Sequence, residues 1–467
     1  MSGQFPMKPT TIAAIATPFG RGGIGIIKIS GPDAVRAAAS LFQPKGSSAN
    51  LPDPAWQPLV RYFYYGHVLD PFNGNLIDEA MCVVMRAPFS YTGEDVTEIQ
   101  AHGGHPVLQS ILNLLMQQGV EMARPGEFTQ RAFLNGRIDL SQAEAVMDMI
   151  EANSEKAAHL AAKQLTGGLK AEVQSMRQEL LQIAAQLEAA IDFPEAAEAV
   201  SKSVLAGYLQ DKVLFPIQTL LDQYAAGHFL REGFRIVIAG SPNVGKSSLM
   251  NCLLGKERSI VTNHPGTTRD MVEDSFIVHG LPVIISDTAG IHDQAGPVER
   301  IGIDIALKEI ESADLVLLML DASQPLQEAS LSFSEQLSGQ AVLLVLNKMD
   351  LASRIDLPFK LSSIPRVSIS AKYHQGIEGL KEQIASFAGA VKNEAADGIV
   401  PRLRHKQALE KAHESASEAS SGLLSDKPEE AIVLDVYEAL AALAEITGES
   451  IKPDILERIF NQFCIGK

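Results

Sequence analysis

The sequence predicts a multidomain chain of α/β and α parts, in which a doubly wound, mostly parallel sheet domain is inserted in a discontinuous helical domain and preceded by an α+β domain. Three observations predict this architecture. Short apolar runs broken by Gly and Pro occupy about the first 135 residues. From about residue 233 apolar runs of strand length alternate with helical segments, and on both sides of that stretch apolar residues recur at helical spacing.

Each part has its own pattern. The runs TIAAIATP, GIGIIKIS and EAMCVVMRAP indicate strands in an N-terminal domain at 1–135. Helical spacing predicts the two parts of the helical domain at 136–232 and 393–467, from the positions Leu180, Ile183, Leu187, Ile191, Ile432, Val436, Leu440 and Leu443. The runs FRIVIAG, PVIISDTAG, DLVLLMLDAS and AVLLVLNKMD indicate parallel strands in the inserted domain at 233–392.

Composition limits the function classes. A hydrophobic fraction of 46% and a charged fraction of 20% are typical of a soluble globular protein, and no apolar run approaches the roughly 18 to 20 residues of a membrane span. Three distant cysteines suit neither a disulfide framework nor a metal site, so we expect a cytoplasmic protein. The net charge of -17 opposes general attraction to nucleic acid, so any RNA contact must be local or assisted by a partner.

The segment GSPNVGKS at 240–247 matches G-x-x-x-x-G-K-[ST] and stands between the strand FRIVIA and the helical segment SLMNCLL. In such a loop, backbone N–H groups and the helix N-terminus bind phosphates, the lysine reaches the terminal phosphates, and the hydroxyl binds magnesium. We therefore predict a P-loop. Its predicted phosphate-contacting residues are Asn243, Val244, Gly245, Lys246, Ser247 and Ser248, with Lys246 also catalytic and Ser247 a magnesium ligand.

The segment NKMD at 347–350 distinguishes GTP from ATP. Asp350 can accept two hydrogens from the Watson–Crick edge of guanine, and Asn347 suits its other edge. Adenine would leave such groups unpaired, at a cost of about 1 to 3 kcal/mol each. The segment SAK could offer the N–H of Ala371 to the base oxygen, so the predicted guanine-binding set is Asn347, Lys348, Asp350, Ser370, Ala371 and Lys372.

The segment DTAG at 287–290 ends another predicted strand. Asp287 can hold magnesium through water, and the N–H of Gly290 can meet the γ-phosphate. Thr288 and Ala289 complete this predicted set, and Thr268 is the candidate for the second magnesium hydroxyl. Together these motifs resemble the translation-factor-related class of P-loop GTPases.

The residues that could activate water for hydrolysis differ from those of small signalling GTPases. Ile291 stands where small signalling GTPases carry the glutamine that orients the attacking water. Glu299 is the acidic candidate for that task, and a solvated carboxylate at a helix start is the other interpretation. The amide of Asn243 can coordinate a monovalent cation beside the phosphates, or it can make a local turn hydrogen bond.

With the segment CIGK at 464–467, these residues resemble the MnmE, or TrmE, family of tRNA modification GTPases. The resemblance spans essentially the whole chain and includes ATPFGRGGIGIIKISG, YTGEDVTE, HGGHPV, ARPGEFTQRAFLNGRIDLSQAEAV and VERIGI. It implies a homodimer that works with the flavoprotein MnmG in a heterotetrameric complex. It also implies that the pair adds a carboxymethylaminomethyl or aminomethyl group to carbon 5 of the wobble uridine of certain tRNAs, with a tetrahydrofolate one-carbon donor.

The resemblance implies further site residues. A potassium ion stimulates the family's GTPase, and its ligands correspond to Asn243, Thr262, His264 and Thr267, of which the threonines also belong to the GTP-contacting set. Glu299 matches the family's water-activating glutamate.

For the N-terminal domain the resemblance implies a site for 5-formyl- or 5,10-methylene-tetrahydrofolate formed by Lys28, Glu98, Arg137 and Lys467. Lys28 stands where the best-known members carry an arginine, and Arg137 stands where they carry a lysine. Cys464 matches a cysteine implicated in the modification reaction, and a small half-buried apolar residue is the alternative interpretation.

Two other function classes remain. A ribosome-assembly GTPase switch usually carries a second GTPase domain or a basic RNA-binding tail, and this sequence shows neither. A structural assembly factor would use its nucleotide only to set dimer geometry, and GTP turnover in potassium against sodium separates it from an enzyme. The basic cluster at 402–406 could meet tRNA phosphates or could be a solvated helix start.

Overall fold

The computed structural model describes residues 10–18, 20–47, 51–193, 201–255, 274–287, 310–326, 331, 333–334, 337, 339–389, 398–425 and 427–467. The chain forms two compact units. The first unit comprises residues 1–147, 164–214 and 408–467, and the second comprises residues 148–163 and 215–407.

The first unit contains a seven-stranded sheet in the order β3-β4-β5-β6-β2-β1-β7. Its pairs are antiparallel except for β1 with β7. The strands are β1 (Ile12–Ile15), β2 (Ile24–Ser30), β3 (Phe42–Pro44), β4 (Tyr64–Leu69), β5 (Leu76–Met85), β6 (Val96–His102) and β7 (Glu121–Met122). The N-terminal α+β domain predicted from the alternating runs is present.

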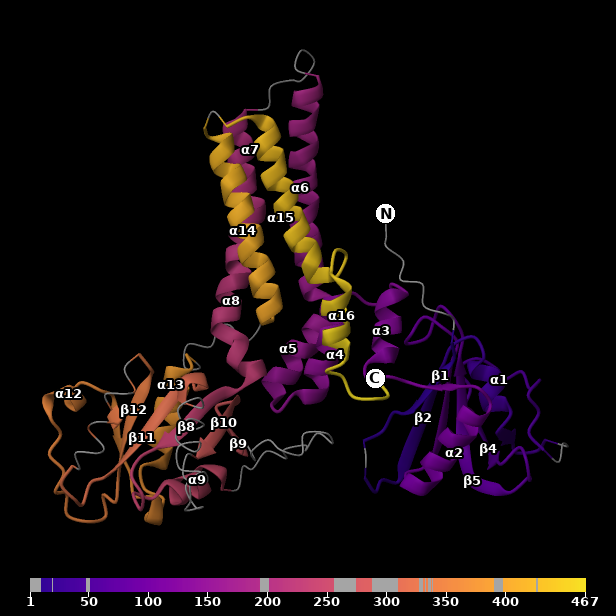
Figure 1. The fold of residues 1–467 in the computed structure, drawn as a ribbon, viewed down its shortest axis with the longest axis horizontal. Coiled ribbons are helices and arrows are strands. Elements are labelled where there is room, and N and C mark those ends of the chain that lie inside the picture. The colour runs from indigo at the N-terminus through magenta and orange to yellow at the C-terminus, as the bar shows by residue number, and fades with distance from the viewer. Residues whose placement is uncertain are drawn as a thin grey trace, which may run out of the picture. The chain divides into compact units, whose positions relative to one another are not determined.

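One face of this sheet packs against the helices α1 (Ala34–Ala39) and α2 (His105–Gln117) (Figure 1). Ile27 and Ile29 of β2 join Ile111 of α2 in the core between them. Because successive side chains of a strand point to opposite faces, Lys28 lies on the other face, where its register partner on β6 is Glu98. The short helix α3 (Glu127–Leu134) follows β7.

Long helices complete the first unit. The helix α6 (Gly168–Asp192) packs on α15 (Glu429–Thr447), followed by α16 (Pro453–Phe460). The helical spacing seen in the sequence is confirmed, because seven of its eight positions are buried and Ile191 is half-buried. The helix α7 (Lys202–Leu209) and a π-helical turn (Gln210–Leu214) follow α6 in the sequence. The helices α4 (Leu140–Glu151), α5 (Glu155–Leu165) and α14 (Leu403–Leu423) have residues in both units.

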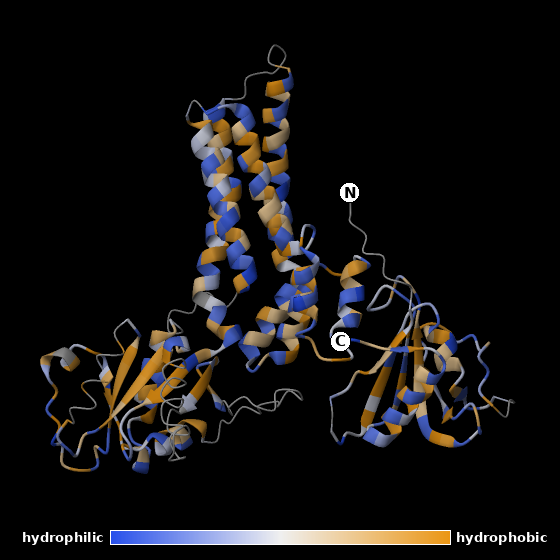
Figure 2. Ribbon diagram, in the orientation of Figure 1, coloured by the Kyte–Doolittle hydropathy of each residue, from blue (hydrophilic) through white to orange (hydrophobic). Residues whose placement is uncertain are grey.

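The second unit contains a six-stranded sheet in the order β13-β12-β11-β8-β10-β9. All neighbours are parallel except β10 with β9 at one edge. The strands are β8 (Phe234–Ala239), β9 (Asp274–Val278), β10 (Leu281–Asp287), β11 (Leu315–Asp321), β12 (Val342–Asn347) and β13 (Arg366–Ser368). The central strands are hydrophobic along their length (Figure 2), as expected when both faces of a parallel sheet are covered.

Separate apolar clusters cover the two faces of this sheet. One includes the helices α9 (Lys246–Leu254) and α13 (Ile377–Phe387), and the other includes Ile310, Leu337 and Leu361, the last from the short helix α12 (Phe359–Ser362). The helix α8 (Phe215–Glu232) leads into β8. The doubly wound domain predicted from the sequence is confirmed.

The basic cluster at 402–406 is neither a solvated helix start nor a free cationic patch. The guanidinium of Arg402 donates to the Asp148 carboxylate, which also pairs with Arg231 at 3.1 Å. The imidazole of His405 is fully buried and accepts the backbone N–H of Arg402 at 3.1 Å. The ammonium of Lys406 lies 5.4 Å from the ring centre of Tyr224. These side chains hold the start of α14 against α4 and α8. In the described part of the chain, no helix is long and apolar enough to cross a membrane.

Candidate functional site

The loop between β8 and α9 needs glycine at two positions. Gly240 has φ +149°, and a Cβ there would lie 2.5 Å from the carbonyl oxygen of Met319. Gly245 has φ +104°, and a Cβ there would lie 2.4 Å from Nδ2 of Asn347. Both values are in the region of φ that favours glycine, and both contacts are too close for a side chain. The two glycines therefore set the backbone of the predicted P-loop.

Lys246 and the first turn of α9 complete this loop. The ammonium of Lys246 donates to the carbonyl oxygens of Gly240 at 2.8 Å and Ser241 at 3.1 Å, so the side chain curls back over the loop. Ser247 and Ser248 are exposed at the helix start, and Asn243 is exposed with φ +65°. Backbone N–H groups at a helix start with a lysine beside them suit a phosphate chain.

Asn347 at the end of β12 joins the P-loop to the segment that begins at Ser370. Its Nδ2 donates to the carbonyl oxygen of Val244 at 2.8 Å, and its Oδ1 accepts the N–H of Ala371 at 3.0 Å. One amide hydrogen and one oxygen lone pair of Asn347 are left for a base. The Ala371 N–H is predicted to donate to the base oxygen. It would then have to donate to both that oxygen and Oδ1 of Asn347.

Asp350 is exposed and held from one side. The buried hydroxyl of Ser370 donates to Oδ1 of Asp350 at 2.6 Å, which leaves the other carboxylate oxygen and further lone pairs for two base hydrogens. The ammonium of Lys372, in the same segment, lies 5.1 Å from the centre of the Tyr373 ring. The structure thus brings the predicted guanine-binding residues together beside the P-loop.

Asp321 is a residue of this site that sequence reasoning missed. It ends β11, and its Oδ2 accepts the ammonium of Lys348 at 2.7 Å, while Oδ1 accepts both the N–H and the hydroxyl of Ser323. Burial raises the pKa of Asp321, but the hydrogen bonds from Lys348 and Ser323 outweigh it and hold the pKa below its usual value. Lys348 itself has φ +68°, an uncommon conformation for lysine. The sequence shows an acidic residue at the end of the strand before NKMD, but it does not show that this residue pairs with Lys348.

Two residues of the predicted magnesium site lie within the described part of the chain. Ser247 offers a hydroxyl, and Asp287 ends β10 beside Ile238 of β8, the strand that leads into the P-loop. Hydroxyl and carboxylate oxygens are the hard donors that magnesium takes, so these residue types fit. The other predicted residues of this region lie outside the described residues: Thr262, His264, Thr267, Thr268, Thr288, Ala289, Gly290, Ile291 and Glu299.

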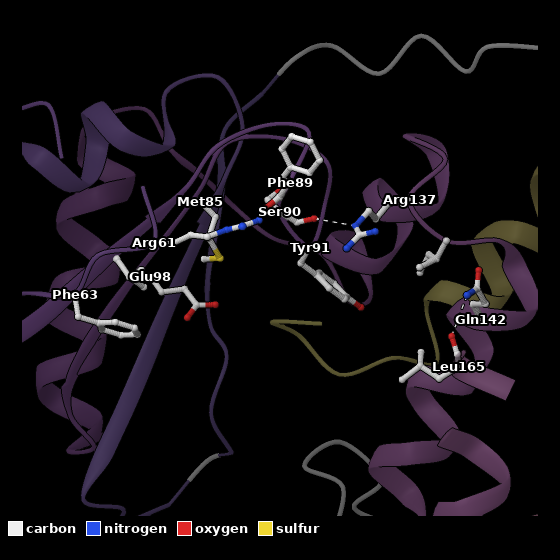
Figure 3. Close-up of a pocket in the computed structure, with 12 residues that line it drawn as sticks. Arg61, Phe63, Met85, Phe89, Ser90, Tyr91, Glu98, Arg137, Gln142 and Leu165 are labelled. Carbon is white, nitrogen blue, oxygen red and sulfur yellow. Dashed lines mark hydrogen bonds between the residues drawn. The ribbon is translucent and has the colours of Figure 1, made fainter. Parts of the chain in front are cut away.

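The first unit has a pocket of about 590 Å³ on the face of its sheet opposite α1 and α2. Glu98 and Arg137 both line it, and in Figure 3 the ring of Tyr91 lies between them. Arg137 donates from Nε to the carbonyl oxygen of Ser90 at 3.3 Å, and Arg61 donates to that of Phe89 at 3.0 Å. The other lining residues are Phe63, Val83, Met85, Ile138, Gln142 and Leu165. The pocket offers one carboxylate, two guanidinium groups and three aromatic rings.

Lys28 lies beside this pocket. Its ammonium is 5.2 Å from the ring centre of Tyr91 and 5.4 Å from that of Phe128. Burial lowers the pKa of Lys28, the Glu98 carboxylate raises it in part, and the charge of Lys467 lowers it further. Lys28, Glu98, Arg137 and Lys467 therefore lie in one region of the first unit, and their role in folate binding stays a prediction.

Cys464 is exposed and forms no disulfide. Its carbonyl oxygen accepts the N–H of Gly126 at 3.4 Å, just before α3. The alternative interpretation of Cys464 as a half-buried apolar residue is not supported, because the side chain is exposed. Whether the thiol takes part in a reaction stays a prediction.

Two family models match the chain: the GTP-binding protein TrmE N-terminus over residues 11–137 and the MnmE helical domain over residues 140–464. The tRNA modification GTPase MnmE of Carboxydothermus hydrogenoformans is 41% identical over 99% of this chain and 100% of its own length. The protein of the same name from Geobacter sulfurreducens is 43% identical over 98% of this chain and 99% of its own. The chain belongs to the MnmE family of tRNA modification GTPases.

Among solved structures, the G domain of the T. maritima FeoB iron transporter is 34% identical over 33% of this chain and 98% of that one, with a TM-score of 0.27. That score is below the level at which two folds are called alike. Family membership over nearly the whole length disfavours a ribosome-assembly switch, because the relatives share the N-terminal and helical parts as well as the nucleotide domain.

Proposed function

The chain is a GTP-hydrolysing enzyme of tRNA modification, and we propose that it uses magnesium and that it acts on wobble uridines. The observation that carries the nucleotide half is the bridge made by Asn347, which bonds the P-loop to the guanine-binding segment. Magnesium, held by Ser247 and Asp287 with Thr268, would neutralise charge on the phosphates, and Lys246 would contact the terminal phosphates. We also propose that the chain divides into four parts, with boundaries at residues 135, 232 and 392.

Hydrolysis is proposed to depend on potassium. The support is Asn243, which is exposed in the left-handed conformation within the P-loop, together with the family's ligands at Thr262, His264 and Thr267. A cation there would supply the charge that an arginine supplies in other GTPases. The test compares GTP turnover in potassium and in sodium. If Glu299→Ala hydrolyses GTP at the wild-type rate in potassium, Glu299 does not activate water.

A tetrahydrofolate one-carbon donor is proposed for the pocket of the first unit. Glu98 can accept hydrogens from the pterin amino and ring N–H groups, and aromatic faces such as Tyr91 suit a flat ring. Lys28, Arg137 and Lys467 would bind the anionic glutamate tail of the folate.

The folate proposal is tested by titrating 5-formyl-tetrahydrofolate into the protein with calorimetry. Glu98→Gln keeps the shape of the side chain and removes its charge, so affinity should fall about tenfold or more. Glu121→Gln, on an exposed residue of β7, is the matched control and should bind as the wild type does. A wild-type protein that gives no heat change would mean that the folate site is misplaced.

The remaining proposals concern partners. We propose a homodimer that binds the flavoprotein MnmG and acts on tRNA in the cytoplasm. Exposed apolar residues near the pocket support self-association: Tyr62, Phe63, Tyr65, Met81 and Phe89. The product is a carboxymethylaminomethyl or aminomethyl group on carbon 5 of the wobble uridine. Mass spectrometry of bulk tRNA from a deletion strain tests this, and unchanged levels of the modified nucleoside would contradict it.

A further inference from the structure

The segment 464–467 is held against the N-terminal domain by backbone contacts. The carbonyl oxygen of Cys464 accepts the N–H of Gly126 at 3.4 Å, and the carbonyl oxygen of Lys467 accepts the N–H of Phe128 at 3.1 Å. Within the segment the N–H of Lys467 donates to the carbonyl oxygen of Cys464 at 3.3 Å, which closes a turn. The segment thus binds the first turn of α3 at two points.

Gly466 permits this approach. It is buried with φ +94°, and a Cβ there would lie 2.5 Å from the carbonyl oxygen of Ile15 and 2.9 Å from Cα of Ala16. Both atoms belong to the backbone at the end of β1, which cannot move aside as a flexible side chain can. Any residue other than glycine would therefore meet both backbone strain and a steric clash at this position.

Gly126, just before α3, also permits a close approach between the N-terminal domain and the C-terminal residues. It has φ +65°, and a Cβ there would lie 2.5 Å from the carbonyl oxygen of Phe460. Phe460 and Phe463 are buried in a cluster with Leu140, so the chain that enters the segment is fixed by its own packing. The segment is thereby fixed at its start by the cluster and at its end by Gly466.

We propose that Gly466 is a positioning residue of the folate site: its lack of a side chain lets segment 464–467 dock in one register, which places the cation of Lys467 beside that of Lys28. This inference rests on the proposed folate function. Two cations held close together repel each other, and an anionic glutamate tail relieves that repulsion when it binds. Both lysines lie at Phe128: the carbonyl oxygen of Lys467 accepts the Phe128 N–H at 3.1 Å, and the ammonium of Lys28 lies 5.4 Å from the centre of the Phe128 ring. The influence of the Lys467 charge on the pKa of Lys28 agrees with this proximity.

Docking matters because a loose segment binds an anion weakly. If Gly466 carried a methyl group, the two hydrogen bonds to α3 would be lost and the Lys467 side chain would sample many positions. Binding would then have to order the segment again, and the entropic cost of this ordering would weaken the affinity. The loss of one charge-assisted contact of this kind corresponds to about a tenfold to a hundredfold rise in Kd.

The experiment compares Gly466→Ala, Lys467→Gln and Ile465→Ala in the full chain. Amide hydrogen exchange at Gly126 and Phe128 reports docking, and titration with 5-formyl-tetrahydrofolate reports binding. Gly466→Ala should speed exchange at both amides and raise Kd. Lys467→Gln should raise Kd by a similar factor while exchange stays at the wild-type rate, because only the charge is removed. Ile465→Ala, on a side chain that is half exposed, should change neither.

Unchanged protection of the helix α15 would show that the variants are folded. Wild-type exchange at both amides in Gly466→Ala would overturn the docking role, and wild-type Kd in either Gly466→Ala or Lys467→Gln would overturn the positioning role. Failure of the proposed function has a different signature, since the wild-type protein itself would then bind no folate.

Discussion

Asn347 donates its side-chain amide to the carbonyl oxygen of Val244 at 2.8 Å, so the residue that begins the guanine-reading motif is bonded to the P-loop. Through its oxygen the same side chain holds Ala371. One buried amide therefore joins the predicted phosphate-binding loop to the predicted base-binding segment, and a change at Asn347 should affect both kinds of binding.

Asn347→Ala should weaken the binding of GTP and GDP together and lower stability. It leaves the Val244 carbonyl and the Ala371 N–H without their partner, at a cost of about 1 to 3 kcal/mol for each group. Titration with a fluorescent guanine nucleotide and thermal unfolding measure the two effects. Asn251→Ala, on an exposed residue of α9, is the control and should behave as the wild type does. A loss of GTP affinity with GDP affinity unchanged would contradict the bridging role.

Asp350→Asn should change the base that the protein prefers from guanine to xanthine. The carboxylate accepts hydrogens from guanine, whereas an amide can donate to the carbonyl that xanthine carries at the same position. The mismatch should cost GTP about tenfold to a hundredfold in Kd, and XTP should gain. Competition between GTP and XTP for a labelled nucleotide measures this. Equal losses for both nucleotides would mean that Asp350 does not contact the base.

Asp321→Asn should raise KM for GTP with kcat unchanged. The ion pair with Lys348 holds a side chain predicted to lie beside the base, and contacts to the base are the same in the ground and transition states. A roughly threefold to tenfold rise in KM corresponds to the loss of one partly exposed ion pair. Asp356→Asn, an exposed carboxylate of the same unit, is the control. A fall in kcat at constant KM would place the role of Asp321 in hydrolysis instead.

Much of the fold and the nucleotide site could be predicted because their signals are local. Apolar strand runs, helical spacing and the motif GSPNVGKS each depend on neighbouring residues, and the P-loop lies where that motif placed it. Asp321 was missed because its partner Lys348 is distant in sequence and only the parallel pairing of β11 with β12 brings them together.

The docking of segment 464–467 was equally hidden. The string CIGK carries no periodicity, and the contact of Gly466 with Ile15 joins positions at opposite ends of the sequence. The boundary of the helical domain also depends on packing, because the structure groups residues 148–163 and 215–232 with the nucleotide-binding sheet. The predicted boundary at 232 therefore stays a proposal.

Lys28→Arg should make folate binding independent of pH on the alkaline side. Burial lowers the pKa of Lys28 below 10.5, so its positive charge, and with it the attraction for an anionic tail, is lost as pH rises through that lowered pKa. An arginine stays charged throughout. Wild-type affinity should therefore fall as pH rises through the lowered pKa of Lys28, below 10.5, while that of Lys28→Arg stays constant.

The stability of the wild type should change in the opposite direction over the same range. Because the folded pKa of Lys28 is below the unfolded one, the charged form costs stability at lower pH, and this cost disappears as pH rises from the lowered pKa toward 10.5. Calorimetric titration and thermal unfolding at matched pH separate the two effects, with Lys45→Arg, another lysine beside an aromatic ring, as the control. If wild-type affinity and that of Lys28→Arg fall in parallel with pH, another group is responsible, and Lys28 does not bind the folate anion.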